Sequence, residues 1–104
     1  LRPSHYASYH LIENAEQHDD REELTVDVVG PICETGDFLA LDRVIQEPMG
    51  GELLALRTAG AYGFSMASTY NARTRPAEVM VSGEQHRLIG LEHARGYHGC
   101  DCVC

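Results

Sequence analysis

The stretch that indicates the fold lies in the first half of the chain: Leu24-Thr25-Val26-Asp27-Val28-Val29-Gly30-Pro31-Ile32-Cys33-Glu34-Thr35-Gly36-Asp37-Phe38-Leu39-Ala40-Leu41. Its first six residues are rich in β-branched side chains and predict a strand, which the Gly-Pro pair ends. A second apolar run begins at Phe38, directly after a Gly-Asp pair. Between the two runs, the sequence therefore predicts a loop that carries a thiol and a carboxylate.

Further strands are expected on the C-terminal side of this stretch. They are residues 53–57, which follow Gly50-Gly51, and residues 77–81 and 87–91. Several short strands with Gly and Pro stops at close spacing are typical of an antiparallel β-barrel or sandwich and not of a helical or βαβ fold. We therefore predict a mainly β chain, with a Greek-key-like β-barrel domain over residues 24–91.

The two flanks of this predicted domain are less patterned. Residues 1–23 are expected to form a short helix and then a polar, solvated connection from Glu13 to Glu23. The first residue is not Met and no apolar signal core follows, so we expect the chain to be a piece of a longer protein. Residues 92–104 are expected to be a divergent and disordered tail. The tail holds three of the four cysteines at alternate positions, which is a poor tetrahedral clamp for zinc, so no metal site is predicted.

Composition limits the classes of function. The 104 residues include 16 acidic and 8 basic side chains, for a formal charge of −8. Such a surface repels phosphate backbones, so we predict no nucleic-acid partner. Apolar runs are much shorter than the roughly 20 residues of a membrane helix, so no membrane partner is expected. The cysteines do not form a disulfide framework, which favours a reduced, cytoplasmic setting.

The loop after Gly30-Pro31 carries the most informative chemistry. A thiol such as that of Cys33 can donate or accept a proton near neutral pH, and a carboxylate such as that of Glu34 can bind an ammonium group. On the residues alone, Cys33 is also explained as a small buried side chain at a strand end. Glu34 and Asp37 would then be ordinary turn residues.

Two other segments carry candidate ligand-binding side chains. Tyr62 lies between glycines in Gly60-Ala61-Tyr62-Gly63, where its hydroxyl could reach a phosphate or a carboxylate. Arg2 and Tyr6 are four residues apart and could both reach one carboxylate. Taken singly, Tyr62 is better explained as a turn residue that caps the core, and Arg2 as a solvated terminal cation.

The order of these segments is more specific than any one of them. Arg2-Pro3 with Tyr6, the loop Gly30-Pro31-Ile32-Cys33-Glu34-Thr35-Gly36-Asp37, then Gly60-Ala61-Tyr62-Gly63-Phe64-Ser65-Met66-Ala67-Ser68, Tyr70-Asn71 and Arg75-Pro76-Ala77-Glu78-Val79 follow in turn. From Arg2 to Val81 this order resembles the C-terminal region of diaminopimelate decarboxylases. Related ornithine decarboxylases typically continue the loop from Cys with Asp, whereas here Glu34 follows Cys33.

The resemblance implies a fold, a reaction and residue roles. Enzymes of this family join an N-terminal (β/α)₈ barrel to a C-terminal β-barrel, and act as homodimers whose active sites are completed by the partner subunit's loop. The implied reaction converts meso-2,6-diaminopimelate to L-lysine and carbon dioxide, a step of lysine biosynthesis. Cys33 would be the catalytic proton donor and Glu34 would bind the distal ammonium group. Arg2 and Tyr6 would bind the distal carboxylate, and Tyr62 would contact the cofactor and the substrate.

The implied cofactor is pyridoxal 5'-phosphate, which such enzymes hold covalently on a lysine. All eight basic residues of the chain are arginines, so that lysine must lie on other polypeptide, and these residues alone are expected to be inactive. Expected partners are the preceding barrel domain, a homodimer partner and an amino-acid substrate. Two alternatives stay open. The first is a catalytically inactive decarboxylase-like regulatory module, and the second is a stand-alone β-barrel of unrelated function. A related ornithine- or arginine-type decarboxylase is a further alternative.

Overall fold

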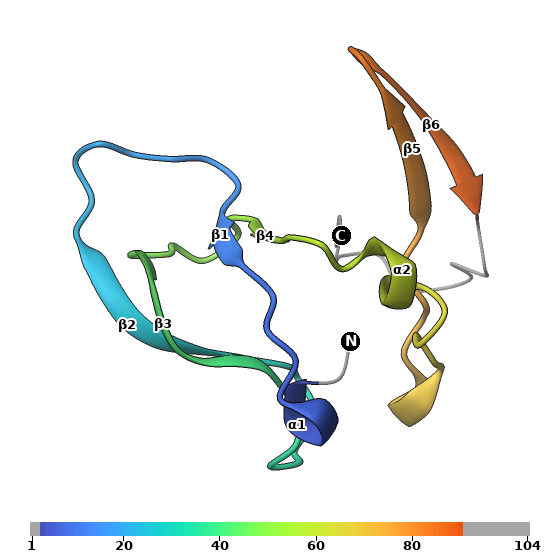
Figure 1. Cartoon of the computed structure of the whole chain (residues 1–104), viewed down its shortest axis with the longest axis horizontal. Coiled ribbons are helices and arrows are strands. Elements are labelled where there is room, and N and C mark those ends of the chain that lie inside the picture. Colours follow the sequence, from blue (N-terminus) through green and yellow to red (C-terminus); the bar gives the residue numbers. More distant parts are fainter. Residues whose placement is uncertain (1–2, 91–104) are drawn as a thin grey trace. The chain divides into compact units, whose positions relative to one another are not determined.

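The computed structural model describes residues 3–90 and divides the chain into two compact units, Leu1–Gly60 and Ala61–Cys104. The elements follow in the order α1 (Pro3–Tyr6), β1 (Ile12–Asn14), β2 (Glu23–Val29), β3 (Phe38–Gln46), β4 (Leu54–Leu56), α2 (Gly60–Gly63), a 3₁₀ turn η1 (Tyr70–Ala72), β5 (Glu78–Ser82) and β6 (Gln85–Gly90). Figure 1 labels the helices and strands along the chain. Strand residues outnumber helical residues by far, so the predicted mainly β class is confirmed.

The first unit is built on the long antiparallel pair β2–β3, whose two ribbons run side by side in Figure 1. The register joins Glu23 to Gln46 at one end and Val29 to Phe38 at the other. It shifts between Val26 and Val28, where β3 carries an additional residue. Asp42 takes up this bulge with a positive φ of 52°, and its backbone N–H donates to Oδ1 of Asp27 at 2.9 Å. A carboxylate on the facing strand therefore stabilises a backbone conformation that non-glycine residues rarely adopt.

A short antiparallel pair, β1–β4, packs beside β3 and closes a small core. The buried apolar side chains among the described residues are Ile12, Ala40 and Ile45. Asn14 is also buried, and its Nδ2 donates to the backbone oxygen of Gln46 at 3.1 Å, which satisfies the amide inside the core. β1 is thus attached to β4 through its backbone and to β3 through this side chain.

The second unit contains the hairpin β5–β6. Ser82 pairs with Gln85, so the two strands are joined by the two residues Gly83 and Glu84. Gly83 has a φ of +59°, a conformation that this turn requires and that glycine adopts without steric cost. Before the hairpin, the guanidinium of Arg75 lies 5.8 Å from the centre of the Phe64 ring.

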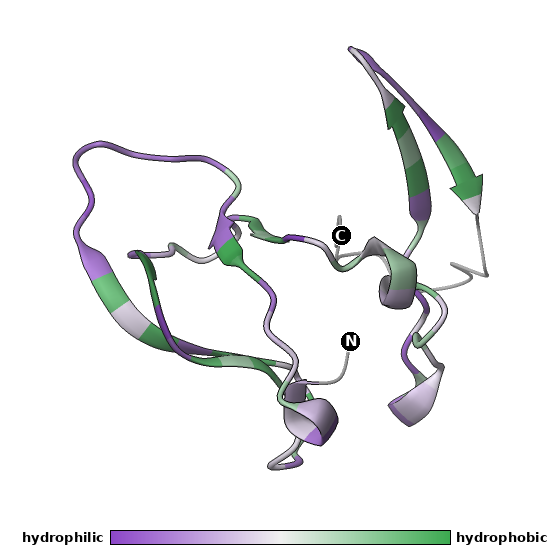
Figure 2. Cartoon of the chain, viewed as in Figure 1, coloured by the Kyte–Doolittle hydropathy of each residue, from purple (hydrophilic) through white to green (hydrophobic). Residues whose placement is uncertain are grey.

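The structure differs from the sequence-based expectation in three local respects. Ile12–Asn14 forms a strand where the polar connection was expected to begin, because pairing with Leu54–Leu56 supplies the stabilisation that its own composition lacks. Residues 60–63 form one helical turn where a tight turn was expected, and β3 extends to Gln46 instead of ending near Leu41. The connection from β1 to β2 is polar, as expected, and Figure 2 shows it in hydrophilic colours.

Each described strand has one hydrogen-bonded partner, giving the pairs β1–β4, β2–β3 and β5–β6. Within residues 3–90 these pairs do not close into a hydrogen-bonded barrel. Many large apolar side chains lie at the surface, among them Tyr9, Val29 and Val44. The segment 92–104, including its three cysteines, lies outside the described residues.

Candidate functional site

The predicted catalytic residue Cys33 and the predicted substrate-binding residue Glu34 lie on the loop that joins β2 to β3, which we call the Cys-Glu loop (residues 30–37). Four hydrogen bonds shape it. The N–H of Gly30 donates to the oxygen of Asp37 at 2.8 Å, and the N–H of Ile32 donates to the carboxylate Oδ2 of Asp37 at 2.7 Å. The N–H of Glu34 donates to the oxygen of Ile32 at 2.8 Å, and the N–H of Asp37 donates to the oxygen of Glu34 at 3.1 Å. The loop is therefore closed on itself beneath Cys33.

This closure turns Cys33 and Glu34 outward. Both residues are exposed, and Cys33 is a free thiol. The alternative explanation of Cys33 as a small buried packing residue is therefore wrong for the chain as it stands. A thiol and a carboxylate on adjacent residues of a projecting loop can act on a ligand only when another surface supplies the remaining walls of a pocket.

Helix α1 lies against the same loop. A Cβ atom at Gly36 would lie 3.8 Å from Oγ of Ser4, an ordinary packing distance, and α1 also packs against β3. Tyr6 ends α1 with 70% of its surface exposed, and its ring contacts His5 with a centroid distance of 6.5 Å. Tyr6, Cys33 and Glu34 are thus exposed residues of the first unit, while Arg2 lies outside the described residues.

The segment that follows α1 is attached to the strands by contacts between distant residues. The guanidinium of Arg43 stacks 3.7 Å from the centre of the Tyr9 ring, a cation–π contact. Nδ1 of His10 lies 3.2 Å from the oxygen of Arg57, and the Arg57 guanidinium pairs with the carboxylate of Glu13 at 2.5 Å. Through these contacts, the segment after α1 is attached to β3 at Arg43 and to the residue after β4, Arg57.

Tyr62 lies on α2 in the second unit, and 64% of its surface is exposed. Within the second unit, Tyr62 therefore does not cap a core. Its phenol hydroxyl can serve as a hydrogen-bond donor or acceptor to a bound group.

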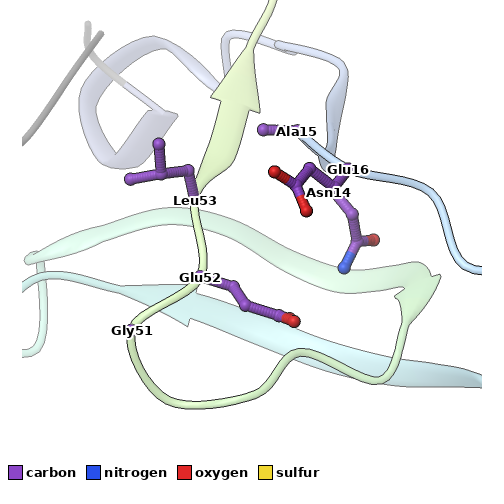
Figure 3. Close-up of a pocket in the computed structure, with 6 residues that line it drawn as sticks. All are labelled: Asn14, Ala15, Glu16, Gly51, Glu52 and Leu53. Atoms are coloured by element: carbon purple, nitrogen blue, oxygen red, sulfur yellow. The ribbon is translucent and has the colours of Figure 1, made fainter.

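A surface pocket of the first unit, drawn in Figure 3, has a different lining. It is formed by the end of β1 and by the turn before β4, and its lining residues are Asn14, Ala15, Glu16, Gly51, Glu52 and Leu53. None of the predicted site residues lines this pocket. The pocket lies where the polar connection between β1 and β2 contacts the turn between β3 and β4, a region that we call the polar joint.

Glu52 makes the main side-chain hydrogen bonds of the polar joint. Its carboxylate accepts from Nη1 of Arg21 at 2.6 Å and from the backbone N–H of Met49 at 2.9 Å. These two hydrogen bonds, with that of Arg21 the larger contribution, lower the pKa of Glu52 from 4.5 to about 2. The same bond raises the pKa of Arg21. Both groups are therefore ionised throughout the neutral range, and their role is to bind each other.

The sequence analysis did not predict the structural role of one residue of the Cys-Glu loop. Asp37 was expected to be an ordinary turn residue, yet its backbone and side chain take part in three of the four hydrogen bonds that close the loop. The available signal was its position at the far end of the loop from Gly30, just before the second strand.

Comparison with known proteins identifies the family. The family described as "Pyridoxal-dependent decarboxylase, C-terminal sheet domain" matches residues 1–60, which include α1, the core strands and the Cys-Glu loop. The chain belongs to this family. The resemblance seen in the order of the sequence motifs is confirmed.

Similar curated relatives include diaminopimelate decarboxylases of two bacteria. The chain is 55% identical over 89 residues to a diaminopimelate decarboxylase of Aquifex aeolicus and 57% identical over 89 residues to one of Neisseria meningitidis serogroup B. In each case the match covers 86% of this chain but 21% of the relative. The chain thus spans about a fifth of the length of these pyridoxal-dependent decarboxylases.

Solved structures agree with this assignment. The crystal structure of AQ1208 from Aquifex aeolicus superimposes with a TM-score of 0.79 at 55% identity, over 84% of this chain and 21% of that chain. A diaminopimelate decarboxylase from M. jannaschii in co-complex with L-lysine gives a TM-score of 0.75 at 39% identity, over 84% and 20% of the two chains. The fold of the described residues is therefore that of a decarboxylase C-terminal sheet domain.

The family's cofactor can be tested against the donor groups present. The chain has arginine as its sole basic side chain besides histidine and contains no lysine, so it cannot supply the amine that binds pyridoxal phosphate covalently. The exposed Tyr62 hydroxyl fits the lesser role of contacting a cofactor bound by other polypeptide. Residues 3–90 contain no cluster of three His, Cys, Asp or Glu side chains arranged to hold a metal ion. Every helix in the same range falls short of the length and hydrophobicity of a membrane span.

Proposed function

We propose that this chain is the C-terminal part of a pyridoxal-phosphate-dependent diaminopimelate decarboxylase, which converts meso-2,6-diaminopimelate to L-lysine and carbon dioxide. The observation that carries the proposal is the Cys-Glu loop, which presents Cys33 and Glu34 outward at the edge of a domain of this family. The identities of 55–57% to curated diaminopimelate decarboxylases support the choice of substrate.

In this proposal Cys33 is the catalytic residue that delivers a proton to the reacting carbon after carbon dioxide has left. Its exposed thiol is compatible with that role, because the donor must reach a ligand bound by another surface. Pyridoxal phosphate, held by other polypeptide, supplies the electron sink for the carbanion. Cys33 then has to be held close to that carbon, and water has to be excluded around the thiol.

The unreactive end of diaminopimelate carries both an ammonium and a carboxylate group, so the site needs an anion and a cation to bind it. Glu34 is proposed to bind the ammonium, and Arg2 with Tyr6 to bind the carboxylate. Arginine can bind a carboxylate with two parallel hydrogen bonds, which would discriminate against lysine as a substrate because lysine lacks that second carboxylate. Tyr62 is proposed to contact the cofactor and the substrate.

The partners in this proposal are a preceding (β/α)₈ barrel domain that carries the cofactor lysine and a second subunit whose site receives the Cys-Glu loop. The setting is cytoplasmic. Exposed apolar side chains support partners of this kind: Val29 and Val44 on the central strand pair have 63% and 61% of their surface exposed. Apolar surface of this extent is usually covered in an assembled protein.

A chimeric enzyme tests the proposal. The residues of this chain that match the Aquifex aeolicus diaminopimelate decarboxylase would replace their counterparts in that enzyme, which keeps its own cofactor lysine. We expect the purified chimera to bind pyridoxal phosphate, measured by its absorbance, and to release carbon dioxide from meso-diaminopimelate at a rate within about tenfold of the parent. A folded chimera that binds the cofactor but releases no carbon dioxide would refute the proposal and favour an inactive, regulatory module.

A further inference from the structure

Asp37 bonds to the Cys-Glu loop through three different atoms. Its backbone N–H donates to Glu34, its backbone oxygen accepts from Gly30, and its carboxylate Oδ2 accepts from the N–H of Ile32 at 2.7 Å. Ile32 directly precedes Cys33, so this carboxylate binds the backbone immediately before the residue that bears the thiol. The half-buried position of Asp37 contrasts with the exposed positions of Cys33 and Glu34.

The space for this carboxylate exists because residue 30 is glycine. A Cβ atom at Gly30 would overlap Oδ2, Oδ1 and Cγ of Asp37. Such an overlap is far inside van der Waals contact, so any larger side chain at Gly30 would displace either the Asp37 carboxylate or the loop backbone. Gly30 and Asp37 therefore form one complementary unit beneath the loop.

We propose that Asp37 is a positioning residue for catalysis, which holds the backbone before Cys33 so that the thiol lies within reach of the reacting carbon. This inference rests on the proposed function, because Cys33 is the group that Asp37 would act through. A proton donor displaced by a fraction of an ångström from its acceptor transfers its proton much more slowly, which is why a hydrogen bond behind the donor affects turnover.

A positioning role of Asp37 is distinguished from a merely structural role by making Asp37→Ala twice, once with Cys33 present and once in a Cys33→Ala variant. In the chimera, Asp37→Ala is expected to lower kcat at least about tenfold, while the cofactor absorbance stays unchanged. In a chimera that already carries Cys33→Ala, the same change is expected to lower the residual kcat less than about twofold, because no thiol is left to position. An equal fold loss in both backgrounds, or an unchanged kcat in the first, would overturn the proposal.

Two further variants keep the proposal testable if Asp37→Ala should destabilise the loop. Asp37→Asn retains a side-chain oxygen that can accept from Ile32, and is expected to keep kcat within about threefold. Gly30→Ala is expected to lower kcat as Asp37→Ala does. The double variant is expected to be no slower than Asp37→Ala alone, because Asp37→Ala removes the three atoms that lie nearest to the added Cβ. A double variant slowed by the product of the two single effects would overturn the complementary-unit argument.

The controls separate this inference from the function on which it rests. An inactive chimera with the natural residues would contradict the proposed function and, with it, the inference that rests on it. An active chimera whose kcat is insensitive to Asp37→Ala would contradict the inference alone. Glu23→Gln, on β2 at the opposite end of the strand from the loop, is the matched control and is expected to leave kcat unchanged.

Discussion

Glu34→Gln isolates the charge of one side chain on the Cys-Glu loop. The backbone of Glu34 donates to Ile32 and accepts from Asp37, and glutamine keeps both of these bonds and almost the same side-chain volume. The change therefore removes one negative charge while leaving the loop closed. In the proposed site, that charge binds the distal ammonium group of diaminopimelate.

The expected magnitude follows from the kind of bond that is weakened. A hydrogen bond between charged groups contributes about 1.5–3 kcal/mol, and each 1.4 kcal/mol or so is a tenfold change in an equilibrium constant. Glutamine keeps a neutral oxygen that still accepts from the ammonium, so the lower part of this range applies. We expect KM for meso-diaminopimelate to rise about tenfold to thirtyfold, with kcat reduced much less.

The assay is steady-state release of carbon dioxide by the chimera across a range of diaminopimelate concentrations. Glu23→Gln is again the control, because it removes the same charge from an exposed residue of β2 at the end of the strand that is remote from the loop. Its KM is expected to equal that of the parent chimera. If KM of Glu34→Gln were also unchanged, Glu34 would not bind the substrate and the assignment of its role would fail.

Three further predictions concern catalysis, the core and the polar joint. Cys33→Ala should lower kcat about 100-fold or more and leave the cofactor absorbance intact, and an undiminished kcat would remove the thiol from the mechanism. Ile45→Ala should lower the free energy of unfolding, measured by denaturant titration, by about 2 kcal/mol or more, because Ile45 is 5% exposed. Ile45→Val should lower it by about 1 kcal/mol, and equal effects of the two variants would contradict a packed core. Because the pKa of Glu52 is lowered from 4.5 to about 2, its pairing with Arg21 adds stability above pH 4.5 that is lost as pH falls toward 2. Glu52→Gln should flatten the pH dependence of stability in that window, and an unchanged slope would argue against the pairing.

The elements that were predictable are those with a strong local signal. The β2 run has β-branched residues and ends at Gly30-Pro31, and both signals act within a few residues of one another. Strands close to β5 and β6 were also predicted, at residues 77–81 and 87–91, although their pairing as a hairpin was not. β1 was not predictable in this way, because Ile12–Asn14 contains one apolar residue and becomes a strand through its pairing with Leu54–Leu56.

In the candidate site too, some features were predictable from local sequence and others were not. The order of motifs was enough to propose Cys33 and Glu34 as site residues, because Cys33-Glu34 after Gly30-Pro31 is a specific combination. The hydrogen-bond partner of the Asp37 carboxylate was not evident, since a carboxylate in a turn has many possible partners. Its partner is settled by the backbone path of the loop, which brings the N–H of Ile32 to 2.7 Å from Oδ2.

Sequence was therefore sufficient for the β class and the family, because each depends on residue types and their spacing along the chain. The tertiary structure alone decided that Cys33 faces outward, that Asn14 is buried against Gln46, and that Gly30 leaves room for the Asp37 carboxylate. The physical reason is that burial and hydrogen bonding depend on which distant atoms meet. Those meetings are set by strand pairing and loop closure, which short-range composition does not encode.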